Sequence, residues 1–475
     1  MRLDKNDIYQ IEKPLITELD REEAFDYVFN YDGKTDNTDT QNIFLSGVKP
    51  ANQNLVNEVN TPIYLPWKKV KHKKLPDGFE YHNSVFTHEV FWAAVKLTRN
   101  SKAQKSPIKT ETGEFFTWSL FPEQERILHS LDMTVGGNLI GFEAPQKKAE
   151  KEKNTVVLNG IIEEAIATSQ LEGASTTRAV AKKFLQEGRK PKNKSEHMIL
   201  NSYLAMKKIE EEYKNKELSL ELLFEMHSLI TQNTINGDEI HRLRKNTDEI
   251  VIESDTVGEI IYIPPSESFL ASEIQNLIDF ANNKNDEYFI HPVIKAVMIH
   301  FWIGYLHPFT DGNGRLARLL FFWYLLKHNY WAVSYLPIST VIKKAPAQYW
   351  QAYVYSEQDD CDLNYFIDFH LRKIQESIDN FKSYIETKSQ ENKTINKSLK
   401  QAYAFNDRQI QLLKYLSKDE NHRTSLTAHV NVYQVTKATG IKDLKALEQE
   451  GFLETTKEGK FLYYYGTTKI ESLFN

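Results

Sequence analysis

Helical periodicity dominates the chain between about residues 155 and 390. Apolar side chains recur there every three to four positions, which predicts amphipathic α-helices at residues 196–214, 218–233, 267–282, 292–306, 315–330 and 362–388. Two of these segments, 292–306 and 315–330, are apolar on nearly every side, so we expect both helices in the interior of a domain. Strands and helices do not alternate, which argues against a parallel α/β sheet.

One strand pattern interrupts this helical region. In IVIESDTVGEIIYIPP, two β-branched runs flank the turn-forming sequence SDTVG, and Pro264 and Pro265 end the second run. Short β-branched runs around such a turn predict a β-hairpin. The middle of the chain is therefore predicted to be an all-helical domain that carries one hairpin.

The C-terminal pattern differs from the middle. Helical spacing at 406–418, 425–431 and 434–450 is followed by two β-prone runs on either side of the turn at 457–460. Three helices and a hairpin in this order are typical of a small winged helix-turn-helix domain. We therefore predict a mainly α protein with four parts: an N-terminal region (1–150), partly helical and packed on the core; the helical domain (151–390); a polar linker (391–404); and the winged helix (405–475).

Composition narrows the class of protein. The 475 residues carry a net charge of -6 and a single cysteine, Cys361, which excludes an internal disulfide framework and a multi-cysteine zinc site. No stretch of about 18 apolar residues could span a membrane, and the first residues lack the apolar core of a signal peptide. We expect a cytoplasmic protein without a membrane partner.

The sequence HPFTDGNGRLAR, from His307 to Arg318, joins the two apolar helices. Polar groups in such a place are costly unless they are used. Gly312 and Gly314 allow the backbone to turn and to approach a ligand, and the free N–H groups of the next helix can bind an anion, with Asn313 adding donors. Arg315 and Arg318 share one face of the first turn, where the helix dipole disfavours positive charge unless an anion offsets it.

Two further residues complete this site. Asp311 would repel a bare phosphate but is well placed if Mg²⁺ lies between its carboxylate and phosphate oxygens. His307, at the end of the preceding helix, can act as a general base near neutral pH. The pattern therefore predicts a cradle for a nucleotide polyphosphate with a base beside it.

Other interpretations of the same residues fit less well. GNGRLA has the spacing of a dinucleotide-binding fingerprint, with Gly312, Gly314 and Ala317, but that fingerprint follows a strand, and here a helix precedes it. No P-loop spacing is present. A plain helix end followed by exposed arginines would explain the glycines but not the histidine, the aspartate and the asparagine.

HPFTDGNGRLAR resembles the motif of the Fic family at every defined position. The resemblance implies an all-helical Fic core with a β-hairpin flap, and an enzyme that transfers AMP from ATP to a Ser, Thr or Tyr hydroxyl of a target protein and releases pyrophosphate. His307 would then deprotonate the target hydroxyl, and Asp311 would hold Mg²⁺. The target, which the sequence does not identify, can include the chain itself.

The remaining roles also follow from the resemblance. Gly312, Asn313 and Gly314 would line the anion hole, Arg315 would contact the phosphates, and Arg318 would face the γ-phosphate. Phe309 would be an apolar plug that fixes the loop in the core. The related Doc branch, which transfers phosphate, has a lysine where Gly314 stands, so Gly314 favours AMP transfer.

A second motif precedes the first by about 140 residues. In TSQLEG, Thr168 and Glu172 lie at i and i+4 on one helix face, and Gly173 follows as a helix-ending residue. Beside a Fic motif, this segment, near 158–173, resembles the family's inhibitory helix. The resemblance implies that Glu172 pairs with Arg318, blocks the γ-phosphate and holds the enzyme inactive. Whether the same glutamate serves removal of AMP stays open.

The hairpin occupies the place of the family's flap, whose strand edge holds the target by main-chain pairing. Its expected edge residues are Ile261, Tyr262 and Ile263. An ordinary structural hairpin is the alternative.

The C-terminal domain allows two interpretations. Lysines on its third helix would face DNA phosphates if the domain bound DNA, whereas acidic residues on the same helix favour a protein contact or a homodimer. The lysines are Lys437, Lys442 and Lys445, and the acidic residues are Asp443, Glu448 and Glu450. The alternative function is therefore a DNA-binding regulator whose Fic core senses nucleotide or modifies itself.

Overall fold

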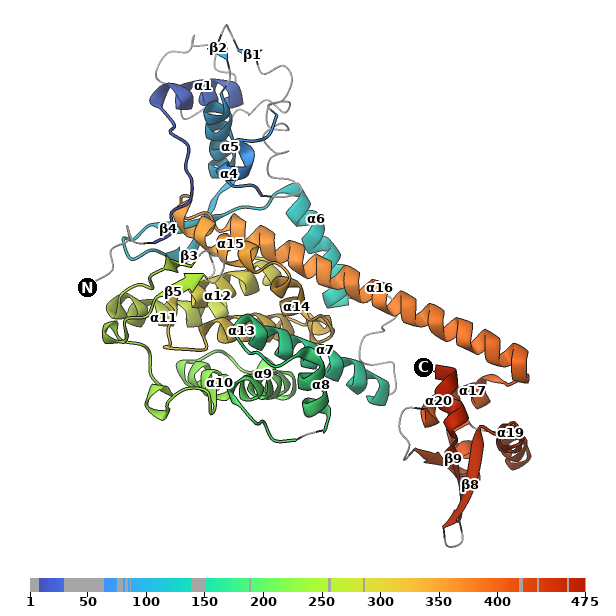
Figure 1. Cartoon of the computed structure of the whole chain (residues 1–475). Helices are drawn as coiled ribbons and strands as arrows, with labels where there is room; N and C mark the ends of the chain where they lie inside the picture. Colours follow the sequence, from blue (N-terminus) through green and yellow to red (C-terminus); the bar gives the residue numbers. More distant parts are fainter. Residues whose placement is uncertain are drawn as a thin grey trace. The chain divides into compact units, whose positions relative to one another are not determined.

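The computed structural model shows a mainly helical protein of two compact units, Met1–Asp379 and Asn380–Asn475 (Figure 1). It describes residues 8–29, 64–74, 80–81, 84–85, 87–137, 150–187, 189–254, 258–284, 287–417, 422–433, 435–458 and 461–474. None of the described helices is both long enough and apolar enough to cross a lipid bilayer.

The first unit contains most of the helices. They are α1 (Glu18–Phe29), α4 (Trp67–Val70), α5 (His88–Lys102), α6 (Pro122–Leu131), α7 (Glu150–Leu171), α8 (Arg178–Glu187), α9 (Lys194–Glu211), α10 (Leu220–Thr231), α11 (Glu267–Ala281), α12 (Pro292–Leu306), α13 (Asn313–Lys327), α14 (Ile338–Lys343) and α15 (Pro346–Gln358). A longer helix, α16 (Asn364–Tyr403), begins in this unit and includes nearly all of the predicted linker 391–404. That segment is therefore helix, because its polar residues continue an amphipathic pattern without a glycine or proline to end it.

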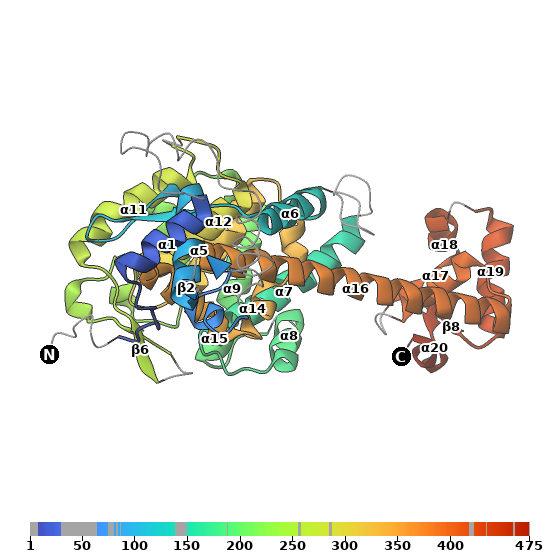
Figure 2. The ribbon, with the colours of Figure 1, turned by 90° about the horizontal axis from the view of Figure 1, so that it is seen from above.

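Helices α12 and α13 form the centre of the first unit. Both are buried on nearly all sides, as predicted, and large side chains such as Trp302 and Trp323 are completely inaccessible. Helix α12 also packs against α11, beside which it lies in Figure 2. Helix α7 packs along α9 and α14 and contacts α13. This packing brings the end of α7 to the start of α13.

The strands of the first unit form antiparallel hairpins. Strand β5 (Ile252–Ser254) pairs with β6 (Glu259–Tyr262), with Ile252 opposite Tyr262, which confirms the predicted hairpin. Residues 255–257 of its turn lie outside the described residues. Two further hairpins, β1–β2 and β3–β4, were not predicted. Their bounds are β1 (Glu80–Tyr81), β2 (Ser84–Val85), β3 (Gln104–Lys109) and β4 (Phe115–Trp118).

A separate apolar cluster joins α1, α4 and α5. Its buried side chains include Ala24, Val28, Trp67 and Trp92. The described part of the N-terminal region is thus partly helical and has its own small core.

The second unit contains three helices followed by a hairpin, as predicted, together with a short strand and a last helix that were not predicted. It comprises α17 (Asp407–Leu416), β7 (Arg423–Thr424), α18 (Leu426–Tyr433), α19 (Lys437–Gln449), β8 (Leu453–Glu458), β9 (Phe461–Gly466) and α20 (Thr468–Phe474). The sheet has the order β7-β9-β8, and Figure 2 shows α17, α18 and α19 grouped together. The assignment to the winged-helix class stays a prediction.

Asp443 corrects one expectation about the second unit. It lies on α19 but is buried, and its carboxylate accepts hydrogen bonds from Arg408 (2.8 Å) and Asn406 (2.8 Å). It therefore holds α17 to α19 and does not oppose the exposed lysines of that helix.

Candidate active site

The predicted loop joins the end of α12 to the start of α13. His307 caps α12 in the left-handed conformation (φ 46°) and donates its N–H to the Ile303 carbonyl at 2.9 Å. Gly312 precedes α13 with φ 87°, and a Cβ atom there would lie 2.7 Å from Thr231 Cγ2. Both the backbone angle and the close approach require glycine. The loop is therefore a tight reversal pressed against α10.

Side chains within the loop lock its conformation. Asn313 donates its Nδ2 to the Phe309 carbonyl at 2.7 Å and accepts the Phe309 N–H at 2.9 Å. Phe309 is fully buried and stacks on His227, with ring centroids 3.7 Å apart, and His227 Nε2 lies 2.9 Å from the Asp311 carbonyl oxygen. Its burial agrees with the prediction of an apolar plug. Because the Asn313 amide is engaged with Phe309, any anion contact of Asn313 would come from its backbone N–H.

Arg244 holds the other side of the loop. Its guanidinium donates to the carbonyls of His307 (2.7 Å), Leu306 (3.1 Å) and Pro265 (2.6 Å). The backbone N–H of Arg244 donates to the Pro308 carbonyl at 2.8 Å. The carbonyls at the end of a helix have no intrahelical partner, so a buried arginine satisfies several of them at once. Arg244 thus fixes the backbone that carries His307.

The environment of His307 keeps its imidazole neutral. Burial lowers the pKa of His307 to about 4, and the positive charge of Arg244 acts in the same direction. At neutral pH the side chain can therefore accept a proton, which is the state that a general base needs.

Asp311 and Arg315 form an ion pair across the first turn of α13. Arg315 Nη2 lies 3.1 Å from Asp311 Oδ1, and Nη1 donates to the Ile230 carbonyl at 2.8 Å. Arg315 is buried, whereas the Asp311 side chain is 40% exposed, with its other oxygen 3.9 Å from Lys194 Nζ. The carboxylate of Asp311 therefore faces solvent at the mouth of the site, where a cation could reach it.

Arg318 lies deeper and pairs with the end of α7, 146 residues earlier in the chain. Its Nη2 lies 2.8 Å from Glu172 Oε1 and 3.0 Å from the Thr168 carbonyl, and its Nε donates to Thr168 Oγ1 at 2.6 Å. Arg318 and Thr168 are almost inaccessible, while Glu172 is 29% exposed. The predicted contact between the two motifs is therefore present.

Gly314 explains how the carboxylate of Glu172 fits there. A Cβ atom at Gly314 would lie 2.2 Å from Glu172 Oε1, far closer than non-bonded carbon and oxygen atoms approach each other. Gly173 follows with φ 87° and ends the helix, as predicted. The carboxylate of Glu172 thus lies against the backbone of the first turn of α13, the place where a helix attracts an anion.

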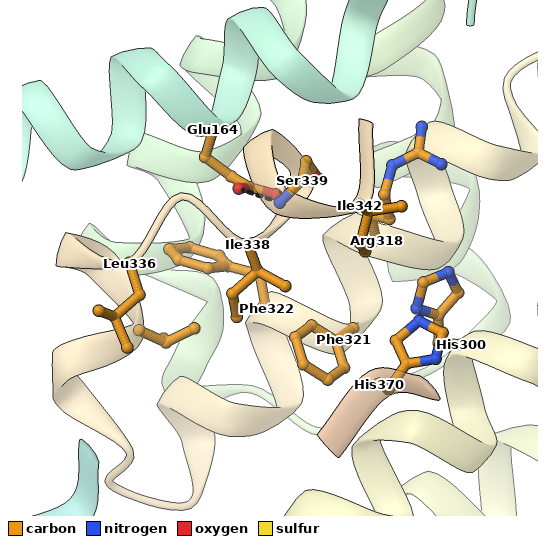
Figure 3. A pocket seen from close by; sticks show the side chains of 11 residues that line it. Glu164, His300, Arg318, Phe321, Phe322, Leu336, Ile338, Ser339, Ile342 and His370 are labelled. Carbon is orange, nitrogen blue, oxygen red and sulfur yellow. Dashed lines mark hydrogen bonds between the residues drawn. The ribbon is translucent and has the colours of Figure 1, made fainter. Parts of the chain in front are cut away.

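The wall behind Arg318 combines a few buried polar side chains with several apolar ones and encloses little space (Figure 3). Tyr349 accepts a hydrogen bond from Arg318 Nη1 at 3.5 Å and shares one with His300 Nε2 at 2.8 Å. His300 lies beside His370, and burial lowers the pKa of both rings, that of His370 to about 3. The cavity that His300, His370 and Glu164 help to line measures about 10 Å³, close to the lower limit for a single water molecule. His300 is therefore a core histidine.

The β5–β6 hairpin lies beside the C-terminal end of α12. The Tyr262 hydroxyl hydrogen-bonds to the carbonyl of Tyr305 in α12, and the Ile261 side chain is buried. Strand β6 ends at Tyr262, so Ile263, the third residue of the predicted edge, follows the strand. The hairpin is thus fastened two residues before His307.

Three residues of this site had no place in the sequence prediction. Arg244 lies in a polar stretch without periodicity, so nothing marked it. His227 does carry a signal, because it is a polar residue on the apolar face of a predicted helix, yet such residues are commonly structural. Tyr349 lies in the first turn of α15, far from the loop in sequence, and only the fold brings it to the site.

Asp311 could hold a divalent metal ion only with help from a substrate. Among the described residues, no three His, Cys, Asp or Glu side chains gather into a ready-made metal site. Mg²⁺ is commonly bound by one or two carboxylates, substrate phosphates and water, and a single exposed carboxylate beside an anion-binding helix end fits that pattern.

Sequence comparisons identify the domain that carries the loop. Residues 217–325 match the Fic/DOC family. The protein adenylyltransferase Fic of Drosophila willistoni is 30% identical over 166 residues, which are 34% of this chain and 31% of that protein. The protein of the same name from Nematostella vectensis is 41% identical over 59 residues, 12% of this chain and 14% of that protein. The chain thus spans about a third or less of these curated relatives.

Solved structures show a more distant likeness. A Fic family protein from Desulfovibrio desulfuricans is 17% identical with a TM-score of 0.48, over 74% of this chain and 97% of that chain. Fic-1 from Caenorhabditis elegans is 19% identical with a TM-score of 0.42, over 56% of this chain and 73% of that chain. The match at 217–325 includes the whole loop from His307 to Arg318, so this part of the chain is a domain of the Fic/DOC family.

Proposed function

We propose that the chain is a protein adenylyltransferase that transfers AMP from ATP to a Ser, Thr or Tyr hydroxyl of a target protein, and that Glu172 holds it inactive. The relatives named protein adenylyltransferase support a Fic-type transferase. The observation that carries the proposal is the position of the Glu172 carboxylate, against Gly314 and paired with Arg318. A carboxylate there occupies a site suited to a phosphate.

The geometry supports the following reaction. Neutral His307 accepts the proton of the target hydroxyl, whose oxygen forms a bond to the α-phosphorus of ATP. The bond from that phosphorus to the bridging oxygen breaks, and pyrophosphate leaves with its electron pair. The N–H groups at the start of α13 and the guanidinium of Arg318 stabilise the phosphate charge. Mg²⁺, held by Asp311 and phosphate oxygens, would neutralise further charge.

The proposed brake acts through Arg318. While its donors are satisfied by Thr168 and Glu172, the γ-phosphate has no free cation at this position. Removing one partner of a buried ion pair costs about 3 to 5 kcal/mol, so the pair is not expected to open freely. Removal of the Glu172 carboxylate leaves Arg318 available to nucleotide.

The test is label transfer from α-labelled ATP with Mg²⁺ in five proteins: the unmodified chain, Glu172→Gly, His307→Ala, the double variant with both changes, and Glu163→Gly. We expect at least tenfold more protein-bound label in Glu172→Gly and none in the double variant that adds His307→Ala. Glu163 is the matched control because it lies on the same helix but pairs with Arg178 and Lys182. Equal labelling of Glu172→Gly and Glu163→Gly would contradict the brake, and no label in any variant would contradict AMP transfer.

A second candidate concerns the Asn380–Asn475 unit. Lys437, Lys442 and Lys445 are exposed on α19, and the burial of Asp443 removes one opposing charge from that surface. This favours a nucleic-acid contact for the alternative regulator. Retention on duplex DNA that falls with salt and is lost in the triple Lys→Glu variant would support it. No retention of the unmodified chain on DNA would favour protein contacts for this unit, and retention that is unchanged in the triple variant would contradict a DNA contact through these lysines.

A further inference from the structure

The N-terminal segment from Ile8 to Thr17 lies extended along the first unit and contacts the β5–β6 hairpin. The Tyr9 N–H donates to the Ile260 carbonyl at 2.8 Å. Figure 1 shows this dark blue segment running from α1 toward β5. Strand β6 pairs with β5 in a two-stranded sheet, and the segment adds one main-chain hydrogen bond to it.

A glutamine at the end of α15 binds the same segment through its backbone. Gln358 Nε2 donates to the Tyr9 carbonyl at 2.7 Å, and Gln358 Oε1 accepts the Ile11 N–H at 2.9 Å. A side-chain amide that contacts the carbonyl of one residue and the N–H of the second residue after it imitates a neighbouring β-strand. These two contacts require an extended backbone at residues 9–11, and they do not depend on the identity of the side chain at position 10.

The side chain of Tyr9 makes a more specific contact with the first unit. The Tyr9 ring meets Trp350 edge to face, with centroids 5.4 Å apart and an interplanar angle of 86°. Edge-to-face packing of two aromatic rings is favourable beyond the area it buries. The surface formed by Ile260, Trp350 and Gln358 therefore fits an extended segment with an aromatic residue at the position of Tyr9.

The place of this surface links it to the candidate active site. Tyr262, two residues after Ile260, is fastened to Tyr305 near the end of α12, and His307 follows that end. A segment bound to β6 therefore lies on the hairpin that is fastened to the helix end carrying His307.

We propose that a target protein binds to the surface formed by Ile260, Trp350 and Gln358. Residues 9–11 occupy this surface and must leave it before a segment of the target can bind. The preferred target segment is extended and carries an aromatic residue that packs on Trp350. This inference rests on the proposed function, because it assigns β6 to target docking. The contacts suit an exchangeable occupant, since main-chain hydrogen bonds at a partly exposed edge compete with water and contribute little each.

Peptide binding tests the inference without any catalytic step. The probe is a fluorescein-labelled peptide with the sequence of residues 8–17, added to the full-length chain and followed by fluorescence anisotropy. Tyr9→Pro removes the N–H that pairs with Ile260 and should free the surface, because proline has no such donor. We expect the peptide to bind Tyr9→Pro at least tenfold more tightly than the unmodified chain.

Three controls sharpen this result. Tyr9→Phe keeps the ring and the N–H and should behave as the unmodified chain does. Adding Gln358→Ala to Tyr9→Pro should weaken binding at least fivefold, and a peptide with proline in place of its tyrosine should not bind. Equal binding to Tyr9→Pro and the unmodified chain, binding indifferent to Gln358→Ala, or no binding to any variant would overturn the inference.

Labelling by α-labelled ATP separates this inference from the proposed function. In the Glu172→Gly, Tyr9→Pro chain, the peptide should lower labelling of other hydroxyls at the concentrations at which it binds. Peptide binding as expected with no AMP transfer in any variant would reject the proposed function but keep the docking surface. AMP transfer with no difference in peptide binding would keep the function and reject the surface.

Discussion

Glu172 lies in the candidate active site and the segment Ile8–Thr17 lies on the neighbouring hairpin, and the two are held by different kinds of contact. Glu172 forms an ion pair with Arg318, whose side chain is only 2% exposed. The segment is held by main-chain hydrogen bonds to Ile260 and Gln358 and by one aromatic contact. Separating the first contact leaves a buried charge, whereas separating the second exposes groups that water satisfies.

This difference indicates which molecule can replace each occupant. Only an anion balances the positive charge of Arg318, so the carboxylate of Glu172 competes with a phosphate for this guanidinium. Any extended backbone satisfies Ile260 and Gln358, so the N-terminal segment competes with a peptide. The two contacts would thus act on nucleotide and on target separately.

The largest effect is expected from Gly314→Ala, which would break the carboxylate contact. The added Cβ would lie 2.2 Å from Glu172 Oε1 and force it away from Arg318. We expect a loss of about 3 kcal/mol in the free energy of unfolding. In a Glu172→Gly background the same change should be neutral or stabilise by up to about 1 kcal/mol, because alanine favours a helix. Denaturant unfolding of the four proteins measures this, and an equal loss in both backgrounds would contradict it.

Thr168→Val should have a smaller effect on the same contact. It removes the hydroxyl that accepts Arg318 Nε and leaves that buried donor unsatisfied, at a cost of about 1 to 3 kcal/mol. We expect lower thermal stability together with more AMP transfer than in the unmodified chain. The matched control is Ser169→Ala, whose hydroxyl bonds Ser202 and not Arg318. Equal AMP transfer in both variants would show that Arg318 needs only Glu172.

Gln358→Ala examines the other side of the comparison. It removes two hydrogen bonds to a partly exposed segment, so we expect a change of less than about 1 kcal/mol in the unfolding free energy. The effect should appear in hydrogen exchange, where the amide of Ile11 becomes at least fivefold faster while amides of α13 do not change. Gln351→Ala, in the same helix, is the control. A global loss of protection would mean that Gln358 supports the core.

The smallest effect is a shift in pH dependence. Burial holds the pKa of His307 at about 4 in the nucleotide-free protein, and acid protonates and inactivates a general base. In the Glu172→Gly chain, kcat/KM should therefore fall only as the pH approaches 4. Bound polyphosphate stabilises the imidazolium, so kcat should fall at a higher pH. Identical acidic limbs in kcat and kcat/KM would contradict this.

Sequence patterns succeeded where local physics decides the structure. The predicted helix 292–306 has the bounds of α12, Pro292–Leu306, because proline favours a helix start and an apolar run fixes the buried element. The hairpin at 252–262 followed from β-branched runs around a turn. The β3–β4 hairpin was missed because QKSPIK contains a proline and lysines, which are uncommon in strands.

The candidate site was predicted unevenly for a similar reason. Its loop lies within twelve consecutive residues, so the chemistry of His307, Asp311 and Arg318 could be recognised together. Arg244 contributes through carbonyl groups that belong to other residues, and such contacts leave no pattern in a sequence. The contact of Tyr9 with β6 depends likewise on a backbone N–H that every residue except proline has, so it leaves no pattern in the sequence.

The sequence by itself determined which chemical groups are available for the candidate site. They are a base, a carboxylate, two arginines and glycines at a helix start, with a second motif upstream that contains a glutamate. The family resemblance implied the pair of Glu172 and Arg318, but only the tertiary structure shows what makes the charges combine in this way. Arg315 pairs with Asp311 four residues away, and Arg318 pairs with Glu172, because the packing of α7 against α13 excludes water from Arg318 and brings one carboxylate within reach. Burial makes that choice, since an arginine removed from water must take the partner that the fold supplies.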